Sequence, residues 1–343
     1  MRTIPRDARV EGSAGGLSLR IATLTAVVDR RAAEVLGVVP SFLRAYGLTP
    51  LAEPTVVKAG IDNLTIKVRT KAGDIAIRQY GAGTASIGFE LELMRHLKSR
   101  GRPVPGIIET RQGVSVTTLA ARPSVIFEFI DGQAPDPHDV SLRRRMGSEL
   151  ALCHLAVSDF RPVINPERNE FSDLARFDAM RSTFADSGFD RFLSDVAAFR
   201  TRETAFLSNL TQLPHGIVHG DLHPHNVLVR GTEVVALLDW GETCMTASFV
   251  RDLGQTMLMW SVTEEDALRP DVDWMRDVRE GYELIRPLTS DEDRALNSAI
   301  RFACLSDAIR HMTTGVHPGL REASECGTYL QFVALTQLPT RFV

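Results

Sequence analysis

The hydrophobic pattern divides the chain into a β-rich first part and a mainly helical second part. Apolar residues at helical spacing predict one helix at 89–99 in the first part. Short β-branched or alternating segments, separated by turn residues, predict strands around that helix at 55–59, 64–70, 74–80, 114–118 and 124–130. We therefore expect a small five-stranded antiparallel sheet with one helix.

The residues before this sheet form two further segments. Residues 1–16 are polar and Gly-rich, so we expect a mobile tail. Apolar residues recur at helical spacing over 17–39, and Pro40 is expected to break that helix. We interpret 17–50 as an N-terminal helical extension.

Helical patterns dominate after Gly132. They cover 142–157 and 192–210, and a Thr-Ser-Asp-Glu capping box at 289–292 opens another helix that runs towards His311. Two short strand patterns interrupt the helices at 227–229 and 234–238. The layout predicts an α+β protein with a β-rich lobe followed by a larger α-rich lobe.

Composition excludes several classes of function. Lys and Arg number 39 against 43 Asp and Glu, a net charge of −4, which argues against a globally basic nucleic-acid binder. The 4 Cys residues form no CxxC pair, so a zinc ribbon is excluded. No apolar run approaches the roughly 18 residues of a membrane helix, and no signal peptide is recognisable. We expect a cytoplasmic protein with a small-molecule substrate, with no nucleic-acid or membrane partner, and of undetermined oligomeric state.

The segment 217–240 carries the clearest chemical pattern. Asp221 lies five residues before Asn226, and Asp239 follows 13 residues later, after a short hairpin. Phosphoryl transfer needs a carboxylate that accepts or orients the proton of the attacking hydroxyl, and hard oxygen ligands for Mg²⁺. The spacing therefore predicts a phosphotransferase site with ATP and Mg²⁺ as cofactors, in which the hairpin returns Asp239 to the side of Asp221.

The β-rich part contains a matching nucleotide-binding pattern. Ile75-Ala76-Ile77-Arg78 matches the kinase strand that carries the phosphate-pairing Lys, with Arg78 at the Lys position. Arg can still hold phosphates bidentately. Glu90 on the following helix is the expected partner of Arg78, and Glu92 is a rival for that position.

Two further positions fit nucleotide binding. The turn containing Gly60 and Asn63 joins the first two strands, where a phosphate-covering loop would lie, although it lacks a GxGxxG pattern and also suits a tight turn. Glu128 and Ile130 lie where a kinase hinge would be, and their backbone would bond adenine.

These motifs resemble the aminoglycoside phosphotransferase/choline kinase superfamily, which has a protein-kinase-like two-lobed fold. The resemblance rests mainly on HGDLHPHNVLV (219–229) and LLDWGE (237–242). It implies an N-lobe over 51–131 and a helical C-lobe over 132–343, with a catalytic loop at 219–229 and a metal-binding loop at 239–242.

The resemblance also implies roles for individual residues. Asp221 would be the catalytic base, and Asn226 and Asp239 would bind Mg²⁺. Arg78 and Glu90 would replace the Lys–Glu phosphate pair. In addition, the backbone of Glu128 and Ile130 would hold adenine, and Asp252 would brace the catalytic loop.

Several polar residues near the motifs leave alternatives open. His219 is expected to be structural, beneath the metal-binding Asp. His223 and His225 can contact the acceptor or face solvent. Glu242 can bind a second Mg²⁺ or the acceptor's amine, or can simply be a turn residue. His154, on an apolar helix face, is expected to be a hydrogen-bonded core histidine rather than a ligand.

Within the superfamily, the chain is most similar to the kinase-fold homoserine kinases over residues 41–312. Segments such as GIDNLTIKV (60–68) and LPHGIVHGDLHPHNV (213–227) carry this similarity. It implies an ATP- and Mg²⁺-dependent O-phosphotransferase that acts on a small metabolite of homoserine or amino-alcohol type. DLHPHN and DWGETC differ from the more phenylalanine-rich versions in those enzymes, which leaves the acceptor open.

Two other functions remain as alternatives. An antibiotic-inactivating phosphotransferase would use the same phosphate chemistry, and the acidic stretch 252–277 would either line a cleft for a polycation or form a solvated face. A nucleotide-binding regulatory protein without activity is supported only by the change from Lys to Arg78.

Overall fold

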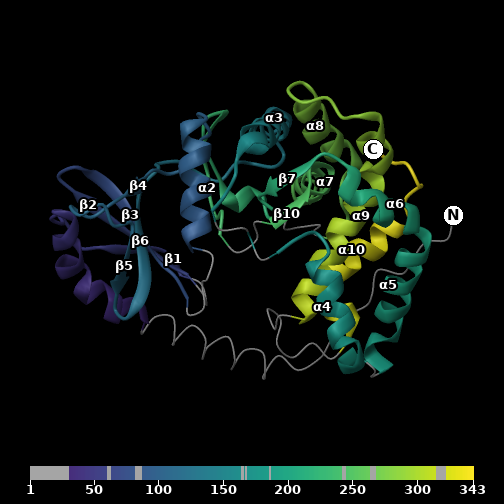
Figure 1. Cartoon of the computed structure of the whole chain (residues 1–343), viewed down its shortest axis with the longest axis horizontal. Helices are drawn as coiled ribbons and strands as arrows, with labels where there is room; N and C mark the ends of the chain where they lie inside the picture. Colours follow the sequence, from purple (N-terminus) through teal and green to yellow (C-terminus); the bar gives the residue numbers. More distant parts are fainter. Residues whose placement is uncertain are drawn as a thin grey trace. The chain divides into compact units, whose positions relative to one another are not determined.

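The computed structural model describes residues 31–59, 63–81, 87–163, 166, 168–184, 187–241, 245–262, 268–313 and 322–343 (Figure 1). They divide into two compact units. Those within Met1–Thr84 and Ile107–Phe129 form the sheet unit, and those within Ala85–Gly106 and Ile130–Val343 form the helical unit. The tail expected at 1–16 and the first part of the extension expected at 17–50, residues 17–30, lie outside the described residues.

The sheet unit contains an antiparallel sheet in the order β1-β2-β3-β6-β4, with β5 paired to β6. Within the described residues it has six strands, so the expected number of five is wrong. The additional strand, β4, has two residues, which are too few to show an alternating pattern. The strands are β1 (Thr55–Ala59), β2 (Leu64–Thr70), β3 (Gly73–Gln79), β4 (Ile107–Ile108), β5 (Val116–Leu119) and β6 (Arg122–Glu128).

One face of this sheet is covered by the segment that precedes it. Residues 31–42 are helical and continue into the 3-10 helix η1 (Leu43–Tyr46), which ends at Gly47 with φ 69°. The helix passes through Pro40, so the expected break there is wrong. A proline inside a helix costs about 3 kcal/mol, but burying an apolar side chain such as Val39 or Leu43 contributes roughly 1.5–3 kcal/mol each. Both side chains are 0% exposed and pack with Ile66 and Ile77 of the sheet.

The helical unit consists of nine α-helices and two short β-ribbons among the described residues. β7 (His215–Val218) pairs with β10 (Met245–Ser248), and β8 (Val227–Arg230) pairs with β9 (Glu233–Leu237). The helices are α2 (Ile87–Ser99), α3 (Val140–Ala156), α4 (Ser172–Met180), α5 (Asp190–Arg202), α6 (Thr204–Asn209), α7 (Phe249–Met259), α8 (Val272–Glu283), α9 (Ser290–Thr313) and α10 (Gly327–Thr336).

The short 3-10 turns of this unit occur mostly at helix ends. One of them, η6 (Pro224–Asn226), lies inside the predicted catalytic loop. The others are η2 (Val157–Asp159), η3 (Arg181–Phe184), η4 (Ser187–Phe189), η5 (Leu210–Gln212) and η7 (Ala323–Glu325). The single helix expected at 192–210 is divided at Glu203, where φ −100° and ψ 22° interrupt the helical backbone.

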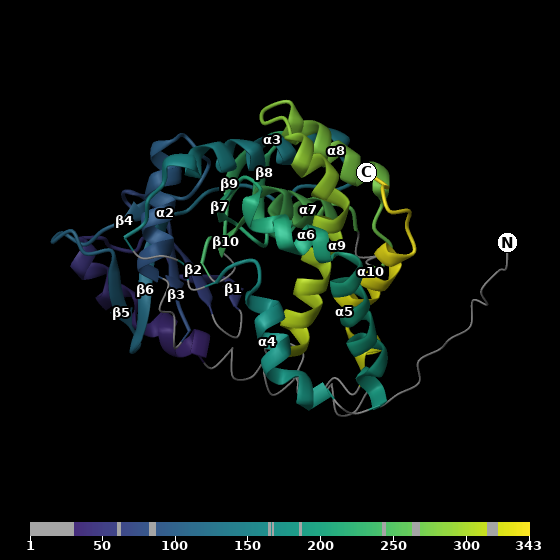
Figure 2. The same cartoon turned by 45° about the vertical axis from the view of Figure 1, so that its right-hand side comes forward.

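Helix α9 is the central helix of the helical unit and contacts α4, α7 and α10 (Figure 2). The predicted capping box at its start is confirmed. The Glu292 N–H donates to Thr289 Oγ1 at 3.2 Å, and the Thr289 N–H donates to Glu292 Oε2 at 3.0 Å. This cap fixes the entry to the helix that carries Asp307 and Arg310.

Candidate active site

The predicted catalytic loop follows directly after β7. Its backbone is held by Asp252, in the first turn of α7. The Asp252 carboxylate accepts hydrogen bonds from Gly220 N at 2.9 Å and His219 N at 3.4 Å. Gly220 has φ 74°, a left-handed conformation that glycine adopts without a Cβ penalty. Burial alone would raise the pKa of Asp252, but hydrogen bonds from His154 and Gly220 outweigh this effect and leave the pKa lowered. Asp252 is therefore an ionised anchor for the turn that precedes Asp221.

His154 on α3 extends this anchor into the core. Its Nε2 donates to Asp252 Oδ2 at 3.0 Å, and its Nδ1 accepts from the Tyr282 hydroxyl at 2.7 Å. The ring stacks on Phe249 with 4.3 Å between ring centroids. Burial lowers the pKa of His154, so the ring is neutral. A neutral imidazole has one N–H group that needs a hydrogen-bond acceptor and one bare nitrogen that needs a hydrogen-bond donor. Both are present, as expected for a hydrogen-bonded core histidine.

Asn226 lies at the end of η6 and is 1% exposed. Its Nδ2 donates to the backbone carbonyl of Asp221 at 2.9 Å, which closes the loop between the two residues. Its backbone carbonyl accepts from Leu238 N at 2.8 Å. Because Nδ2 is used inside the loop, Oδ1 is the atom of this amide that can serve as a ligand.

Asp239 follows β9 and has φ 68°, a strained conformation for a residue other than glycine. His219 supports the backbone immediately before it. His219 Nε2 donates to Leu238 O at 2.8 Å, and Asp221 N donates to His219 Nδ1 at 3.2 Å. Trp240 packs against the His219 ring, with 4.6 Å between centroids. One buried histidine thus connects the backbone at Asp221 to the backbone that precedes Asp239.

The other two histidines of the loop differ in position. His223 Nε2 lies 3.8 Å from Asp221 Oδ2, and both side chains are partly exposed. His223 Nδ1 accepts from His225 N at 3.1 Å, and the His225 side chain is exposed. His223 is therefore beside the Asp221 carboxylate, whereas His225 is on the outside of the loop. Glu242 lies outside the described residues.

The donor atoms fit a magnesium ion that arrives with a nucleotide. Asn226 and Asp239 offer one amide oxygen and one carboxylate. In the described part of the chain, no group of three His, Cys, Asp or Glu side chains could hold a metal by itself. Mg²⁺ in nucleotide enzymes is bound by one or two protein oxygens together with phosphate oxygens and water. Asn226 and Asp239 match such a site, in which the protein supplies only some of the ligands of the metal.

Glu90 on α2 is 1% exposed and lies beside the chain that follows Asp239. A Cβ added at Gly241 would be 2.9 Å from Glu90 Oε2, so this carboxylate lies directly against the backbone at Gly241. Its rival Glu92 accepts hydrogen bonds from Val163 N at 3.0 and 3.1 Å instead. Of the two, Glu90 is the one next to the Asp239 segment.

The remaining nucleotide-binding candidates lie in the sheet unit, apart from Ile130, which begins the second segment of the helical unit. Arg78 on β3 pairs with Thr65 and Val125 in the register and alternates with Ile77, which faces the buried core. Its guanidinium carbon is 5.0 Å from the Tyr80 ring centroid. Glu128 ends β6 and is exposed, and Asn63 precedes β2. Gly60 lies outside the described residues.

Two supports of the loop have no local sequence signal. Trp260, just after α7, donates from Nε1 to Leu222 O at 3.0 Å. Tyr282 on α8 holds His154. Single aromatic residues on apolar helices are typical of ordinary cores, so only the tertiary contacts reveal their role. Arg310 on α9, which interacts electrostatically with Asp221, was likewise not predicted.

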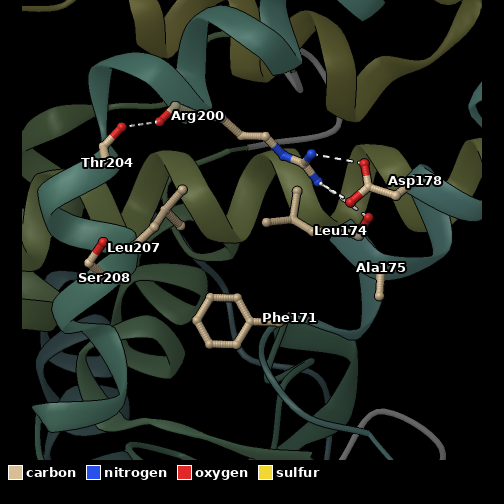
Figure 3. Close-up of a pocket in the computed structure, with 8 residues that line it drawn as sticks. All are labelled: Phe171, Leu174, Ala175, Asp178, Arg200, Thr204, Leu207 and Ser208. Carbon is tan, nitrogen blue, oxygen red and sulfur yellow. Dashed lines mark hydrogen bonds and ion pairs between the residues drawn. The ribbon is translucent and has the colours of Figure 1, made fainter.

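A separate cavity of about 470 Å³ lies between α4 and the α5–α6 pair (Figure 3). Arg200 donates to both carboxylate oxygens of Asp178 at 2.8 and 2.9 Å at its edge. No residue of the catalytic loop lines this cavity, so it is distinct from the candidate active site. Its lining residues are Phe171, Leu174, Ala175, Asp178, Arg200, Thr204, Leu207 and Ser208. Among the described helices, none has the length and apolar character needed to span a membrane.

Comparison with known proteins agrees with this geometry. The profile of the phosphotransferase enzyme family matches residues 53–288. A homoserine kinase of Parvibaculum lavamentivorans is 30% identical over 286 residues, which is 79% of this chain and 85% of that protein.

Solved structures show the same fold at low sequence identity. A microcompartment-associated aminopropanol kinase has a TM-score of 0.64 at 19% identity and covers 87% of this chain and 95% of its own. An aminoglycoside phosphotransferase of Alicyclobacillus acidocaldarius has a TM-score of 0.61 at 16% identity and covers 86% and 91%, respectively. The fold is therefore protein-kinase-like, as expected. The chain belongs to the phosphotransferase enzyme family and is a small-molecule kinase whose phosphate acceptor is a hydroxyl group.

Proposed function

We propose that the protein transfers the γ-phosphate of ATP, as its Mg²⁺ complex, to the hydroxyl of a small metabolite of homoserine type. The observation that carries this proposal is the shared frame of Asp221, Asn226 and Asp239. Asn226 bonds the backbone of Asp221, and His219 connects that backbone to Leu238, next to Asp239. The proposed carboxylate base and two oxygen ligands thus share one set of partly buried hydrogen bonds.

Each residue has a defined part in the reaction. Asp221 accepts or orients the proton of the acceptor hydroxyl. The oxygen of that hydroxyl forms the new bond to the γ-phosphorus while the bond between the γ-phosphorus and ADP breaks. Asn226 and Asp239 hold Mg²⁺, which when bound neutralises charge on the phosphates. His223, 3.8 Å from Asp221, lies where it can contact the acceptor. Catalysis is then mainly positioning and electrostatic stabilisation.

The nucleotide-binding roles in this proposal follow the sequence motifs. Arg78 would contact the phosphates, and Glu90 would be the acidic residue of the phosphate pair. Asn63, which precedes β2, belongs to the segment that would cover the phosphates. The backbone of Glu128 and Ile130 bonds the adenine, and we expect the enzyme to work in the cytoplasm.

Two observations favour a homoserine-type acceptor over a polycationic antibiotic. A homoserine kinase is 30% identical to this chain over most of its length, whereas the aminoglycoside phosphotransferase structure is 16% identical and shares the fold. Three of the described acidic residues of 252–277 are also used within the structure. Asp252 anchors the loop, Asp271 caps α8, and Asp277 pairs with Arg143 at 2.7 Å.

The test is ATP consumption by the purified protein with Mg²⁺ and single acceptors. The panel contains homoserine, threonine, ethanolamine, choline, and aminoglycoside and nucleoside antibiotics. We expect turnover with homoserine, its loss in Asp221→Asn, and retained ATP binding in that variant. Asp291→Asn, an exposed carboxylate on α9, is the matched control and should behave as the wild type. Turnover only with an antibiotic, or near-normal turnover in Asp221→Asn, would contradict the proposal.

A further inference from the structure

Arg310, in the last turn of α9, bonds Asp307 on the same helix, and Asp307 is bonded in turn from α7. Arg310 Nη2 donates to Asp307 Oδ1 at 2.9 Å, and Gln255 Nε2 on α7 donates to Asp307 Oδ2 at 2.9 Å. Both oxygens of Asp307 are therefore engaged, and that side chain is 9% exposed. The Arg310 side chain is 19% exposed, so its guanidinium is fixed but still reached by solvent.

Two more arginines lie close to Arg310. Arg168 pairs with Asp173 of α4 at 3.1 Å, and Arg251 on α7 donates to Gln255 at 3.3 Å. Arg168 is influenced by the other two: burial and the charges of Arg310 and Arg251 lower the pKa of Arg168 despite the opposing effect of Asp173. We name Arg168, Asp173, Arg251, Asp307 and Arg310 the guanidinium cluster.

Helix α7 links the guanidinium cluster to the candidate catalytic base. Asp252 on α7 accepts from Gly220 N, next to Asp221, at 2.9 Å, and Gln255, one turn further along α7, donates to Asp307, which holds Arg310. Burial alone would lower the pKa of Arg310, but the carboxylates of Asp307, Asp221 and Asp173 outweigh this effect and leave it raised. Arg310 is therefore cationic at any working pH and within electrostatic reach of Asp221. An acceptor that places its hydroxyl at Asp221 has its other functional groups near this cation.

The charge of the cluster discriminates between acceptors. It contains three Arg and two Asp side chains, so one positive charge is in excess before Asp221 is counted. A polycationic or purely amino-alcohol acceptor gains nothing from such a group. An acceptor with a carboxylate gains charge-assisted hydrogen bonds, and the planar guanidinium fork matches a carboxylate in shape.

We propose that Arg310, oriented by Asp307 and Gln255, binds the carboxylate of an amino-acid acceptor whose hydroxyl lies at Asp221. This inference rests on the proposed function and deepens it, because it assigns a residue that recognises the carboxylate of a homoserine-type acceptor. It makes Arg310 a specificity-determining residue on α9, outside the catalytic motifs.

The experiment compares homoserine with 3-aminopropan-1-ol, which is homoserine without its carboxylate. For the wild type we expect kcat/KM to be about 10- to 100-fold higher with homoserine, the range of a charge-assisted hydrogen-bonded pair. Arg310→Gln should raise the KM for homoserine by a similar factor and leave the KM for 3-aminopropan-1-ol and the affinity for ATP unchanged. Arg310→Lys, which keeps the charge and loses the fork, should give an intermediate KM for homoserine.

Arg294→Gln is the matched control, since Arg294 is an exposed arginine of the same helix. ATP affinity and the melting temperature of each variant show whether it is folded. Equal losses with both acceptors, or an unchanged KM for homoserine in folded Arg310→Gln, would overturn the inference while leaving the proposed function intact. A wild type that phosphorylates only carboxylate-free compounds would overturn the inference by itself, and one active only on antibiotics would overturn both.

Discussion

His154 on α3 donates a hydrogen bond to Asp252 on α7 at 3.0 Å, and Asp252 in turn binds the backbone N–H of Gly220 next to Asp221. This pair joins two helices to the loop that carries the candidate base. Tyr282 continues the connection, because its hydroxyl bonds His154 and accepts from Arg286 Nη1 at 3.0 Å. The position of the loop is thus set by a buried polar network in which each described partner has a complementary donor or acceptor.

Replacing Asp252 with Asn should impair both stability and turnover. The amide keeps one acceptor oxygen but places an NH₂ group against Gly220 N–H or His154 Nε2–H, and a buried unsatisfied donor costs about 1–3 kcal/mol. We expect a loss of that size in the free energy of unfolding and a fall in kcat with little change in the KM for ATP. Denaturant titration and steady-state kinetics measure the two effects. Wild-type kcat in a folded Asp252→Asn protein would show that the loop does not need this anchor.

The buried histidines predict a pH dependence of stability. Burial lowers the pKa of His154 and His219 below their ordinary value of 6.5. The unfolded chain therefore binds more protons than the folded chain below about pH 6.5, so the free energy of unfolding falls as the pH decreases through that range. Each histidine contributes a slope of up to about 1.4 kcal/mol per pH unit.

Urea denaturation between pH 5 and 8 measures this slope. His154→Gln removes one titrating group. The slope of its free energy of unfolding against pH should therefore be smaller than that of the wild type by up to the contribution of one bound proton, about 1.4 kcal/mol per pH unit. Equal slopes in the wild type and His154→Gln would contradict the assignment of a neutral, buried His154.

Asp239→Asn should weaken the binding of Mg²⁺ without disturbing the backbone. Asp239 has φ 68°, and Asn tolerates this conformation about as well as Asp, so the substitution tests the charge alone. We expect the Mg²⁺ concentration for half-maximal activity to rise about tenfold or more, because a carboxylate ligand is lost. A magnesium titration at saturating ATP is the measurement, and an unchanged midpoint would exclude Asp239 as a ligand.

Gly281→Ala should separate α3 from α8. A Cβ at Gly281 would lie 1.8 Å from the Arg144 carbonyl oxygen, and no rotamer change can relieve a clash with backbone. We expect the protein to lose about 1–3 kcal/mol or more of stability. Gly37→Ala is the control, because its Cβ would meet nothing within 4 Å, and a helical Gly-to-Ala change should stabilise by up to about 1 kcal/mol. Thermal unfolding of both variants distinguishes the two results.

Ala121→Gly should stabilise the sheet unit. Ala120 and Ala121 form the two-residue turn between β5 and β6 with φ 46° and 61°, a conformation that costs an L-residue about 1–2 kcal/mol. Glycine adopts it without that cost, so the melting temperature should rise. Ala76→Gly in the middle of β3 should instead lower it. A lower melting temperature for Ala121→Gly would show that the alanine methyl group contributes more by packing than its backbone strain costs.

The local sequence predicted the elements whose pattern is longer than a few residues. The hairpin of β8 and β9 and the capping box of α9 were expected within a residue or two, because alternation, turn residues and caps act over short distances. Strand β4 was missed because it has only two residues. The break expected at Pro40 was wrong because burial of Val39 and Leu43 against the sheet outweighs a local preference.

The sequence by itself determined the chemical types at the site: the spacing of Asp221, Asn226 and Asp239 indicates a phosphotransferase, and the family resemblance implied that Asp252 braces the loop. Tertiary structure decided which further residues support and surround them. His154, Tyr282 and Arg310 come from three different helices, α3, α8 and α9. Their role depends on burial and on distances between segments far apart in the chain, which no local spacing encodes. The catalytic loop could be read from one continuous segment, whereas its anchor and the cation beside it exist only after the helices pack.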